Sequence, residues 1–308
     1  MDRLYCTVAD LLDDLEAGGT RPGAESRVLG KIREASAWID QRIGNFVPVT
    51  ETRRFDGDGS RDLYVPALLA LTGLVDDGIT ITTSQVLLNP RNRLWERGPY
   101  IRLSVDPDAT ELYQFTAEAD AVAVTGRWGL YEEAVATGAT VASQTDSATS
   151  LTVDNAAGIS AGANLLIESE QELVTATGAA SDSTANTAEA LDAEEEEIDV
   201  DNGAAVNIGE VLKINFEQMK VLDKAGNTLL VAKGWNGTSR SAHLTGQDVY
   251  VYRTFTVARG VNGTTAAAHT NKAVSRYVPP ADVHYLCKQI AALMLKKAQS
   301  GFAGKAGN

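Results

Sequence analysis

Apolar residues recur every three or four positions in three stretches of the chain, which is the spacing of an amphipathic helix. The first stretch follows Thr7, which can cap a helix with Asp10 three positions later, and it stops before the glycines at 18 and 19. The second covers 24–43, and the third covers 279–299 near the carboxyl end. We expect three helices, and the opening and closing ones should pack together because each has an apolar face that needs a partner.

Between the second and third helices, alternating apolar and polar positions are interrupted by turn residues, which is typical of short strands. The run Asp-Gly-Asp-Gly at 56–59 indicates a hairpin between its flanking strands. We assign the early strands and the helices to one core of residues 1–138, which 278–308 completes. The expected early strands are 47–55, 63–65, 79–83, 100–105 and 121–125.

Two internal repeats lie in the middle of the chain. At an offset of 47, the segment from Leu151 matches the segment from Ile198, and both contain Val-Asp-Asn. At an offset of 26, Val-Ala-Lys-Gly-Trp-Asn-Gly-Thr at 231–238 matches Val-Ala-Arg-Gly-Val-Asn-Gly-Thr at 257–264. These segments are the first and second halves of a repeated unit.

The order of the halves indicates that one unit is inserted into the other. First halves begin near 149 and 196, and second halves begin near 229 and 255. The inner pair is contiguous and forms a module over 196–252, so the outer halves 149–178 and 254–277 form a second module around it. An incomplete extra half is the alternative to this nesting.

Each module is expected to contain about five short strands, closed or nearly closed into a small barrel that hides the strand edges. The Asn-Gly pairs Asn236-Gly237 and Asn262-Gly263 are interpreted as structural turns. The segment 179–195, rich in alanine, serine, threonine and glutamate, is interpreted as a linker. The predicted fold class is therefore α+β, a helical core with β hairpins that carries two nested five-stranded β modules.

Charge and cysteine content narrow the classes of function. The 308 residues include 41 acidic and 27 basic ones, a net charge of −14. Binding to the phosphate backbone of DNA needs clustered lysine and arginine, which this acidic chain lacks. We therefore expect double-stranded DNA to pass through without being bound specifically. The longest apolar stretch, 65–75, is far shorter than the roughly 20 residues of a membrane-spanning helix. We expect Cys6 and Cys287 to be two buried thiols rather than to form one long-range disulfide.

Candidate catalytic and metal-binding motifs do not match their required spacing. A calcium loop starting at Asp56 would have Arg61 and Ala67 where glycine and glutamate are needed. His243 and His269 occupy equivalent positions of the repeat, which favours a structural role. We therefore expect no enzyme, no metal and no cofactor.

Several stretches carry a resemblance to a known family. Two are Ala-Ser-Ala-Trp-Ile-Asp-Gln-Arg-Ile-Gly-Asn-Phe at 35–46 and Glu-Thr-Arg-Arg-Phe-Asp-Gly-Asp-Gly-Ser at 51–60. Together with 124–129, 256–269 and 277–283, they resemble head–tail connector (adaptor) proteins of tailed bacteriophages. The inner module, 196–252, is an addition to the part that the resemblance covers.

The resemblance implies a structural protein of the virion neck, at the head–tail interface, which is assembled in the host cytoplasm. It implies a homo-oligomeric ring, expected to have twelve copies, that lies below the portal protein and extends the DNA channel. A stopper or tail-completion protein would dock on this ring, the inner module is a candidate contact to the capsid, and no membrane is involved. A closed ring also gives amphipathic helices the partner surface they lack in one subunit.

The carboxyl end is expected to dock on the portal in such a ring. Lys296 and Lys297 follow the apolar face of the last helix, and Phe302 and Lys305 lie in the tail beyond it. We expect Phe302 to be the apolar anchor and the lysines to steer the tail as it becomes ordered on binding.

Aromatic residues of the inner module offer an alternative function. Trp235, Tyr250 and Tyr252 would suit a platform for sugar rings, which would make the chain a carbohydrate- or host-surface-binding virion protein. Packing within the module is the other interpretation of these residues. An enzyme acting on polysaccharide is a third hypothesis.

Overall fold

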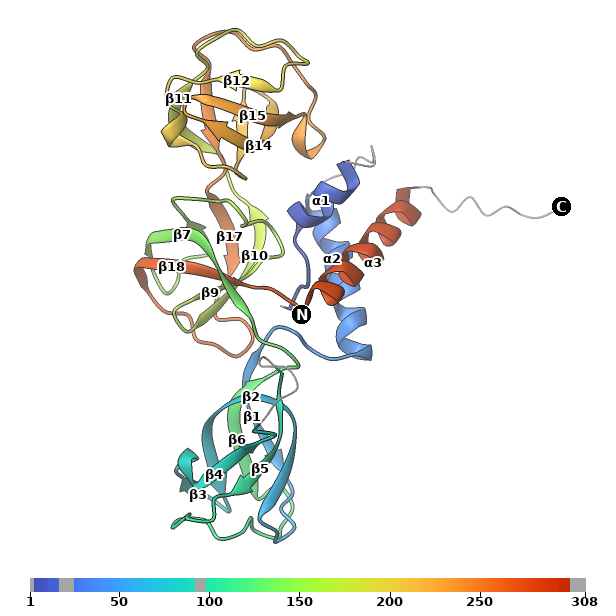
Figure 1. Cartoon of the computed structure of the whole chain (residues 1–308), viewed down its shortest axis with the longest axis vertical. Helices are drawn as coiled ribbons and strands as arrows, with labels where there is room; N and C mark the ends of the chain where they lie inside the picture. Colours follow the sequence, from blue (N-terminus) through green and yellow to red (C-terminus); the bar gives the residue numbers. More distant parts are fainter. Residues whose placement is uncertain (1–2, 17–24, 92–97, 300–308) are drawn as a thin grey trace, which may run out of the picture.

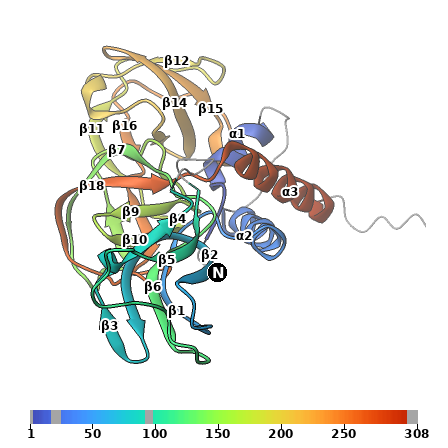
Figure 2. The same ribbon diagram turned by 60° about the horizontal axis from the view of Figure 1, so that its bottom comes forward.

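The computed structural model describes residues 3–16, 25–91 and 98–299 (Figure 1). Within these residues the protein is mostly β, with three six-stranded antiparallel sheets, two of them curled into half-barrels, and three helices that make up 19% of the chain. The predicted α+β class with five-stranded modules is therefore wrong. The three sheets follow one another along the long axis, and the helices lie together on one side of them (Figures 1 and 2).

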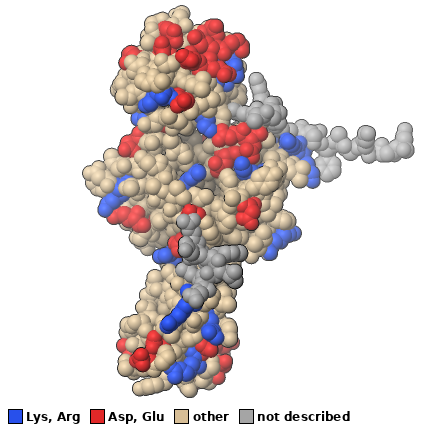
Figure 3. All heavy atoms as spheres, viewed as in Figure 1, with Lys and Arg blue, Asp and Glu red and all other residues tan. Residues whose placement is uncertain are grey.

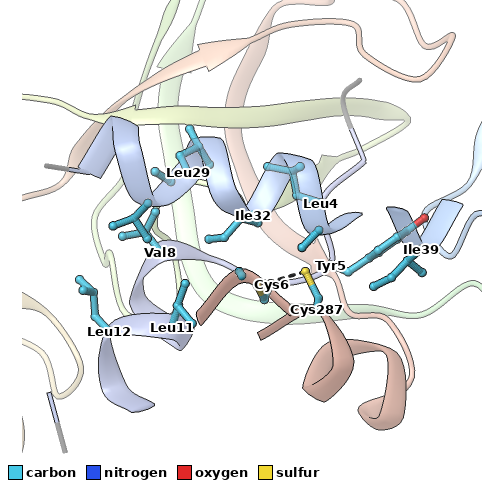
Figure 4. Packing of buried hydrophobic residues seen from close by; sticks show 14 of the residues in the cluster. Leu4, Tyr5, Cys6, Val8, Leu11, Leu12, Leu29, Ile32, Ile39 and Cys287 are labelled. Atoms are coloured by element: carbon cyan, nitrogen blue, oxygen red, sulfur yellow. Dashed lines mark hydrogen bonds between the residues drawn. The ribbon is translucent and has the colours of Figure 1, made fainter. Parts of the chain in front are cut away.

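The three helices share one apolar core. The predicted capping box is present, because the Thr7 N–H donates to Asp10 Oδ2 at 2.9 Å and the Asp10 N–H donates to Thr7 Oγ1 at 3.2 Å. The apolar faces of all three helices meet in this core, part of which is drawn in Figure 4. Within the described residues, no helix has the length and apolar character needed to cross a membrane. The helices are α1 (Val8–Glu16), α2 (Glu25–Arg42) and α3 (Ala281–Gln299).

The first sheet contains the early strands, in the order β1-β6-β2-β5-β4, with β3 paired to β2. The predicted hairpin between the first two strands is wrong, because β6 lies between β1 and β2 and Val124 pairs with both Arg53 and Leu74. Gly57 packs against Thr116 instead, where an added Cβ would lie 1.9 Å from the Thr116 carbonyl oxygen. The strands are β1 (Val49–Phe55), β2 (Asp62–Asp76), β3 (Ile79–Ile81), β4 (Val86–Asn89), β5 (Tyr100–Val105) and β6 (Val122–Trp128).

The second sheet, which we call the outer module, has the order β7-β18-β9-β10-β17-β8. Its sixth strand, β7, lies before the predicted start of the module and pairs along β18. Alanine, threonine and glycine fill much of β7, so its sequence has little of the apolar alternation that predicts a strand. The strands are β7 (Ala134–Gln144), β8 (Ser150–Thr152), β9 (Asn164–Ile167), β10 (Glu170–Thr177), β17 (Thr254–Ala258) and β18 (His269–Tyr277).

The third sheet, the inner module, has the order β11-β16-β13-β14-β15-β12, and all of its strands lie between β10 and β17 in the chain. Its first strand, β11, belongs to the segment predicted as a linker, and it pairs with β16. The chain leaves and re-enters the outer module at one point, where the Gly178 N–H donates to the Thr254 carbonyl at 2.8 Å. The strands are β11 (Ser181–Asn186), β12 (Glu197–Asp199), β13 (Val211–Ile214), β14 (Glu217–Ala225), β15 (Thr228–Lys233) and β16 (Asp248–Val251).

Candidate functional site

A buried glutamate joins the two halves of the repeat in each module. In the inner module, Glu217 at the start of β14 accepts hydrogen bonds from the backbone N–H groups of Gly234 and Ser241, each at 3.0 Å. His243 Nε2 lies 2.8 Å from the same carboxylate. The loop that follows β15 is thereby tied to β14.

The outer module repeats these contacts at the equivalent residues. Glu170 accepts from the N–H groups of Gly260 and Ala267 at 3.0 and 2.8 Å, and His269 Nε2 lies 3.0 Å from it. The halves therefore pair as the nested order requires, 170 with 260–269 and 217 with 234–243. The histidines and glutamates of the repeat hold loops closed, and this structural need explains their recurrence.

The two Asn-Gly pairs form left-handed turns in both modules. Asn236 and Asn262 have φ of 55° and 54°, and the glycines that follow, Gly237 and Gly263, have φ of 74° and 78°. A Cβ on Gly263 would lie 1.8 Å from the carbonyl oxygen of Thr50, so this turn packs directly on β1. The outer turn thus joins the outer module to the first sheet.

A cation lies beside each glutamate, but its bonding differs between the modules. Arg259 Nε lies 2.7 Å from Glu170 and 2.8 Å from Glu172, so one guanidinium serves two buried carboxylates. In the inner module, Lys233 donates to the carbonyls of Asp192 and Ser241 at 2.5 and 3.1 Å. Its distance to Glu217 is 3.9 Å. The equivalents of Glu172 and Gln144 there are apolar, Met219 and Leu191.

Gln144 Nε2 donates to Glu172 Oε2 at 3.3 Å, and we call Gln144, Glu170, Glu172, Arg259 and His269 the outer cluster. Burial alone would raise the pKa of Glu170, but hydrogen bonds from Arg259, Ala267, Gly260 and His269 lower it to about 2. Burial raises the pKa of Glu172, although Arg259 opposes the shift. The pKa values of these two carboxyl groups, which lie two residues apart, are thus shifted in opposite directions.

The outer cluster also brings together a set of candidate metal ligands. One ligand atom each from Glu170, Glu172 and His269 lies within 4.8 Å of the others. The Arg259 guanidinium already hydrogen-bonds Glu170 and lies 2.8 Å from Glu172, so a cation of the protein stands where a metal ion would bind. This arrangement fits an internal ion network better than a metal site.

A cavity of about 510 Å³ lies between α1 and the two modules, and Trp235, Gln218 and Tyr252 help to line it. Trp235 is only 5% exposed, and Lys220 Nζ lies 4.7 Å from the centre of its ring. Lys220 is itself paired with Asp13 of α1 at 2.5 Å. The indole face expected to stack on a sugar is therefore covered.

Of the other two aromatic residues, Tyr252 accepts a hydrogen bond from Gln218 at 3.1 Å, and Tyr250 donates to Asp248 at 3.4 Å. Trp235 corresponds to Val261 of the outer module, which is also buried. These aromatic side chains contribute to packing and internal hydrogen bonds.

Helices α2 and α3 expose large apolar side chains. On α3, Tyr285 and Leu293 are 61% and 53% exposed, and they fall on one helix face together with Gln289. On α2, Trp38 is partly exposed and the Arg42 guanidinium lies 4.4 Å from its ring centre. We call the surface of α3 formed by Tyr285, Gln289 and Leu293 the helical face.

The predicted portal-docking residues lie only partly within the described chain. Lys296 and Lys297 are exposed in the last turn of α3. Basic side chains gather at this end of the helix in Figure 3, beside the acidic patch over α1. Phe302 and Lys305 lie outside the described residues.

The sequence pattern did not predict the roles of Glu172, Gln144, Arg259 and Lys233. Arg259 and Lys233 could have been found, because they occupy the one position of the repeated second half where both copies have a lysine or an arginine. Glu172 and Gln144 have no such signal, since the repeat places apolar residues at their equivalents.

No family model, no curated protein and no solved structure matches this chain.

Proposed function

We propose that the chain is a structural head-to-tail connector (adaptor) of a tailed phage virion. Copies form a closed ring below the portal protein, extend the channel through which DNA passes, and dock the next neck component. The residues quoted from the core and from the outer module support this proposal through their resemblance to connector proteins.

The helical face is the observation that carries the proposal. Tyr285 and Leu293 expose apolar surface on α3, a helix whose opposite face is already buried against α1 and α2. Their spacing of eight residues places both side chains on one face of the helix, where a neighbouring copy would cover them. The helices lie on one side of the molecule (Figure 2), so neighbouring copies can meet through them while the sheets stay outside the contact.

The negative charge of the chain supports a channel through which DNA passes without being bound. Asp10, Asp13 and Asp14 of α1 are paired with His284, Lys220 and Lys288, so the acidic residues of this helix also position the neighbouring elements. The net charge of −14 remains, and walls of that sign do not bind phosphates. The exposed Lys296 and Lys297 lead towards the tail that we propose docks on the portal.

Native mass spectrometry and electron microscopy of the purified chain, alone and with the portal protein of the same phage, test the proposal. We expect closed rings of one copy number, with twelve copies as the expected number. The double variant Tyr285→Ser, Leu293→Ser should weaken association by about tenfold or more per contact, because each contact loses two buried anchors.

The matched control is Phe216→Ser, which removes an apolar side chain that is 93% exposed at the β13–β14 turn of the inner module. This variant should form rings like the wild type. Single copies at all concentrations, both alone and with the portal, would overturn the proposal. Equal loss of rings in the double variant and the control would show that the helical face is not the contact.

A further inference from the structure

The two cysteines of the chain lie against each other although 281 positions separate them. Cys6 precedes α1 and Cys287 lies in α3, and their sulfur atoms are 3.3 Å apart (Figure 4). Both are buried, at 3% and 0% exposure. A disulfide has an S–S length of about 2.05 Å, so each sulfur would have to move by less than about 1 Å to form one.

The surroundings of the two thiols differ. The Cys6 thiol donates a hydrogen bond to Cys287 Sγ, and Ser36 Oγ lies 3.5 Å from the same sulfur. The hydrogen bond from Cys6 and the contact with Ser36 lower the pKa of Cys287, while donation and burial raise that of Cys6. Cys287 is therefore suited to attack the Cys6 sulfur once that sulfur has been oxidised, since the thiolate is the reactive form.

A small cavity gives a reagent access to Cys6, which is one of its lining residues, whereas Cys287 is not. The cavity has a volume of about 50 Å³, and Asn164 and His284 are also among the residues that line it. The side-chain oxygen of Asn164 is buried without a hydrogen-bond partner among the described residues, while its Nδ2 donates to the Leu4 carbonyl at 2.8 Å. The cavity is large enough for a molecule of the size of water or hydrogen peroxide, and Asn164 offers it an acceptor.

We propose that Cys6 and Cys287 are a redox pair that hydrogen peroxide converts into an intramolecular disulfide. The Cys6 sulfur attacks one peroxide oxygen, the O–O bond breaks, and the hydroxide that leaves takes up the thiol proton to become water. The resulting sulfenic acid on Cys6 is attacked by the Cys287 sulfur, the S–O bond breaks and a second water leaves. In sum, two thiols and one peroxide give one disulfide and two waters.

The disulfide would bind the segment before α1 covalently to α3. The helical core is otherwise held at this point by apolar packing and by hydrogen bonds such as that from the Tyr5 N–H to Ser36 Oγ at 3.2 Å. Closing a loop of this length restricts the unfolded chain, so the oxidised protein should be more stable than the reduced one. The inference stands on the geometry of the cysteines and does not depend on the proposed function.

The experiment treats the reduced, folded full chain with equimolar hydrogen peroxide and follows the intact mass. We expect a loss of two hydrogen atoms and one peptide pair that links Cys6 to Cys287 in a non-reducing digest. A phosphine reductant should reverse both changes. The melting temperature should rise by about 5 to 10 °C on oxidation and return on reduction.

Two serine variants assign the roles of the sulfurs. Cys287→Ser should accumulate a sulfenic acid on Cys6, seen as the gain of one oxygen atom in the intact mass, whereas Cys6→Ser should react at least about tenfold more slowly. The wild-type mass decides the proposal even where a variant fails to fold. Addition of two or three oxygen atoms, a disulfide between two chains, or no reaction before unfolding would each overturn it.

Discussion

The two nested modules share one frame but are joined to the rest of the protein to different degrees. Each has six strands, a buried glutamate bound to a histidine, and an Asn-Gly turn in the left-handed region. The outer module lies between the first sheet and the inner module and touches the helices, whereas the inner module lies at one end (Figure 1). Features that both modules share are required by the fold unit itself, and features that only one module has follow from its position in the protein.

The outer module is hydrogen-bonded to several other parts of the protein. Asn164 donates to the Leu4 carbonyl at 2.8 Å, and Gln171 donates to the Pro48 carbonyl at 3.0 Å. The Thr177 hydroxyl donates to Glu25 of α2 at 2.6 Å. Residues before α1, in α2 and before β1 therefore all depend on this sheet for their placement.

The inner module is attached at fewer points. Glu210, fully buried, bonds Arg253 at 2.6 and 2.8 Å and accepts from the Ala156 N–H at 3.0 Å. Lys220 reaches Asp13 of α1. The inner module is thus an attachment to a framework that the outer module organises, and damage to each should have different consequences.

The largest expected effect is the difference in stability and in hydrogen-exchange protection between the variants Glu170→Ala and Glu217→Ala. Removing Glu170 leaves Arg259 and His269 buried without their main partner, at a cost of about 3 to 5 kcal/mol. We expect this variant to lower the stability of the helices and both neighbouring sheets, measured by thermal unfolding and by hydrogen exchange resolved along the chain.

Glu217→Ala should expose amides of β14, β15 and the loop to His243, and should lower protection of the helices less than Glu170→Ala does, because the inner module meets the helical core through Trp235 and Lys220. Equal loss of protection in both regions for the two variants would contradict the hierarchy between the modules. Thr152→Ala, on an exposed strand position, serves as the control with little effect.

A smaller effect is expected from giving the outer module the apolar pair of the inner one. The double variant Gln144→Leu, Glu172→Met removes a buried carboxyl group and leaves Arg259 bound to Glu170. We expect a gain of about 1 to 2 kcal/mol at pH 8, measured by denaturant unfolding. The reverse change, Leu191→Gln with Met219→Glu, should destabilise the inner module.

The pH dependence identifies the cause of that gain. Because the pKa of Glu172 is raised above 4.5, the folded state holds its proton more tightly, and the wild type loses stability as the pH rises above 4.5. Glu170, with a pKa of about 2, has the opposite effect: its contribution is lost as the pH falls below 4.5. The gain in the double variant should therefore shrink towards pH 4.5, and a gain independent of pH would contradict this origin.

The sequence predicted the elements whose apolar spacing is strong. Val8 to Leu15, the capping pair Thr7 and Asp10, and the faces of α2 and α3 all follow the helical period. The strands β7 and β11 were missed, because alanine, serine and threonine give them little apolar contrast and their pairing with β18 and β16 decides their conformation.

Contacts between side chains that are far apart in the sequence were harder to predict. The equivalence of His243 and His269 was visible in the repeat, but their glutamate partners depend on how the two halves meet. The 3.3 Å contact of Cys6 and Cys287 depends on how the chain ends pack, which no local pattern encodes.

Electron microscopy of the full chain and of a chain without the inner module tests the central claim most directly. Residues 179–252 are replaced by two glycines between Gly178 and Arg253, because the Gly178 N–H already meets the Thr254 carbonyl at 2.8 Å. We predict closed rings of the same copy number and channel width for both chains, with density missing only where the inner module projects. Single copies or open filaments for the full chain would contradict the connector proposal, and rings lost only in the shortened chain would contradict the organising role of the outer module.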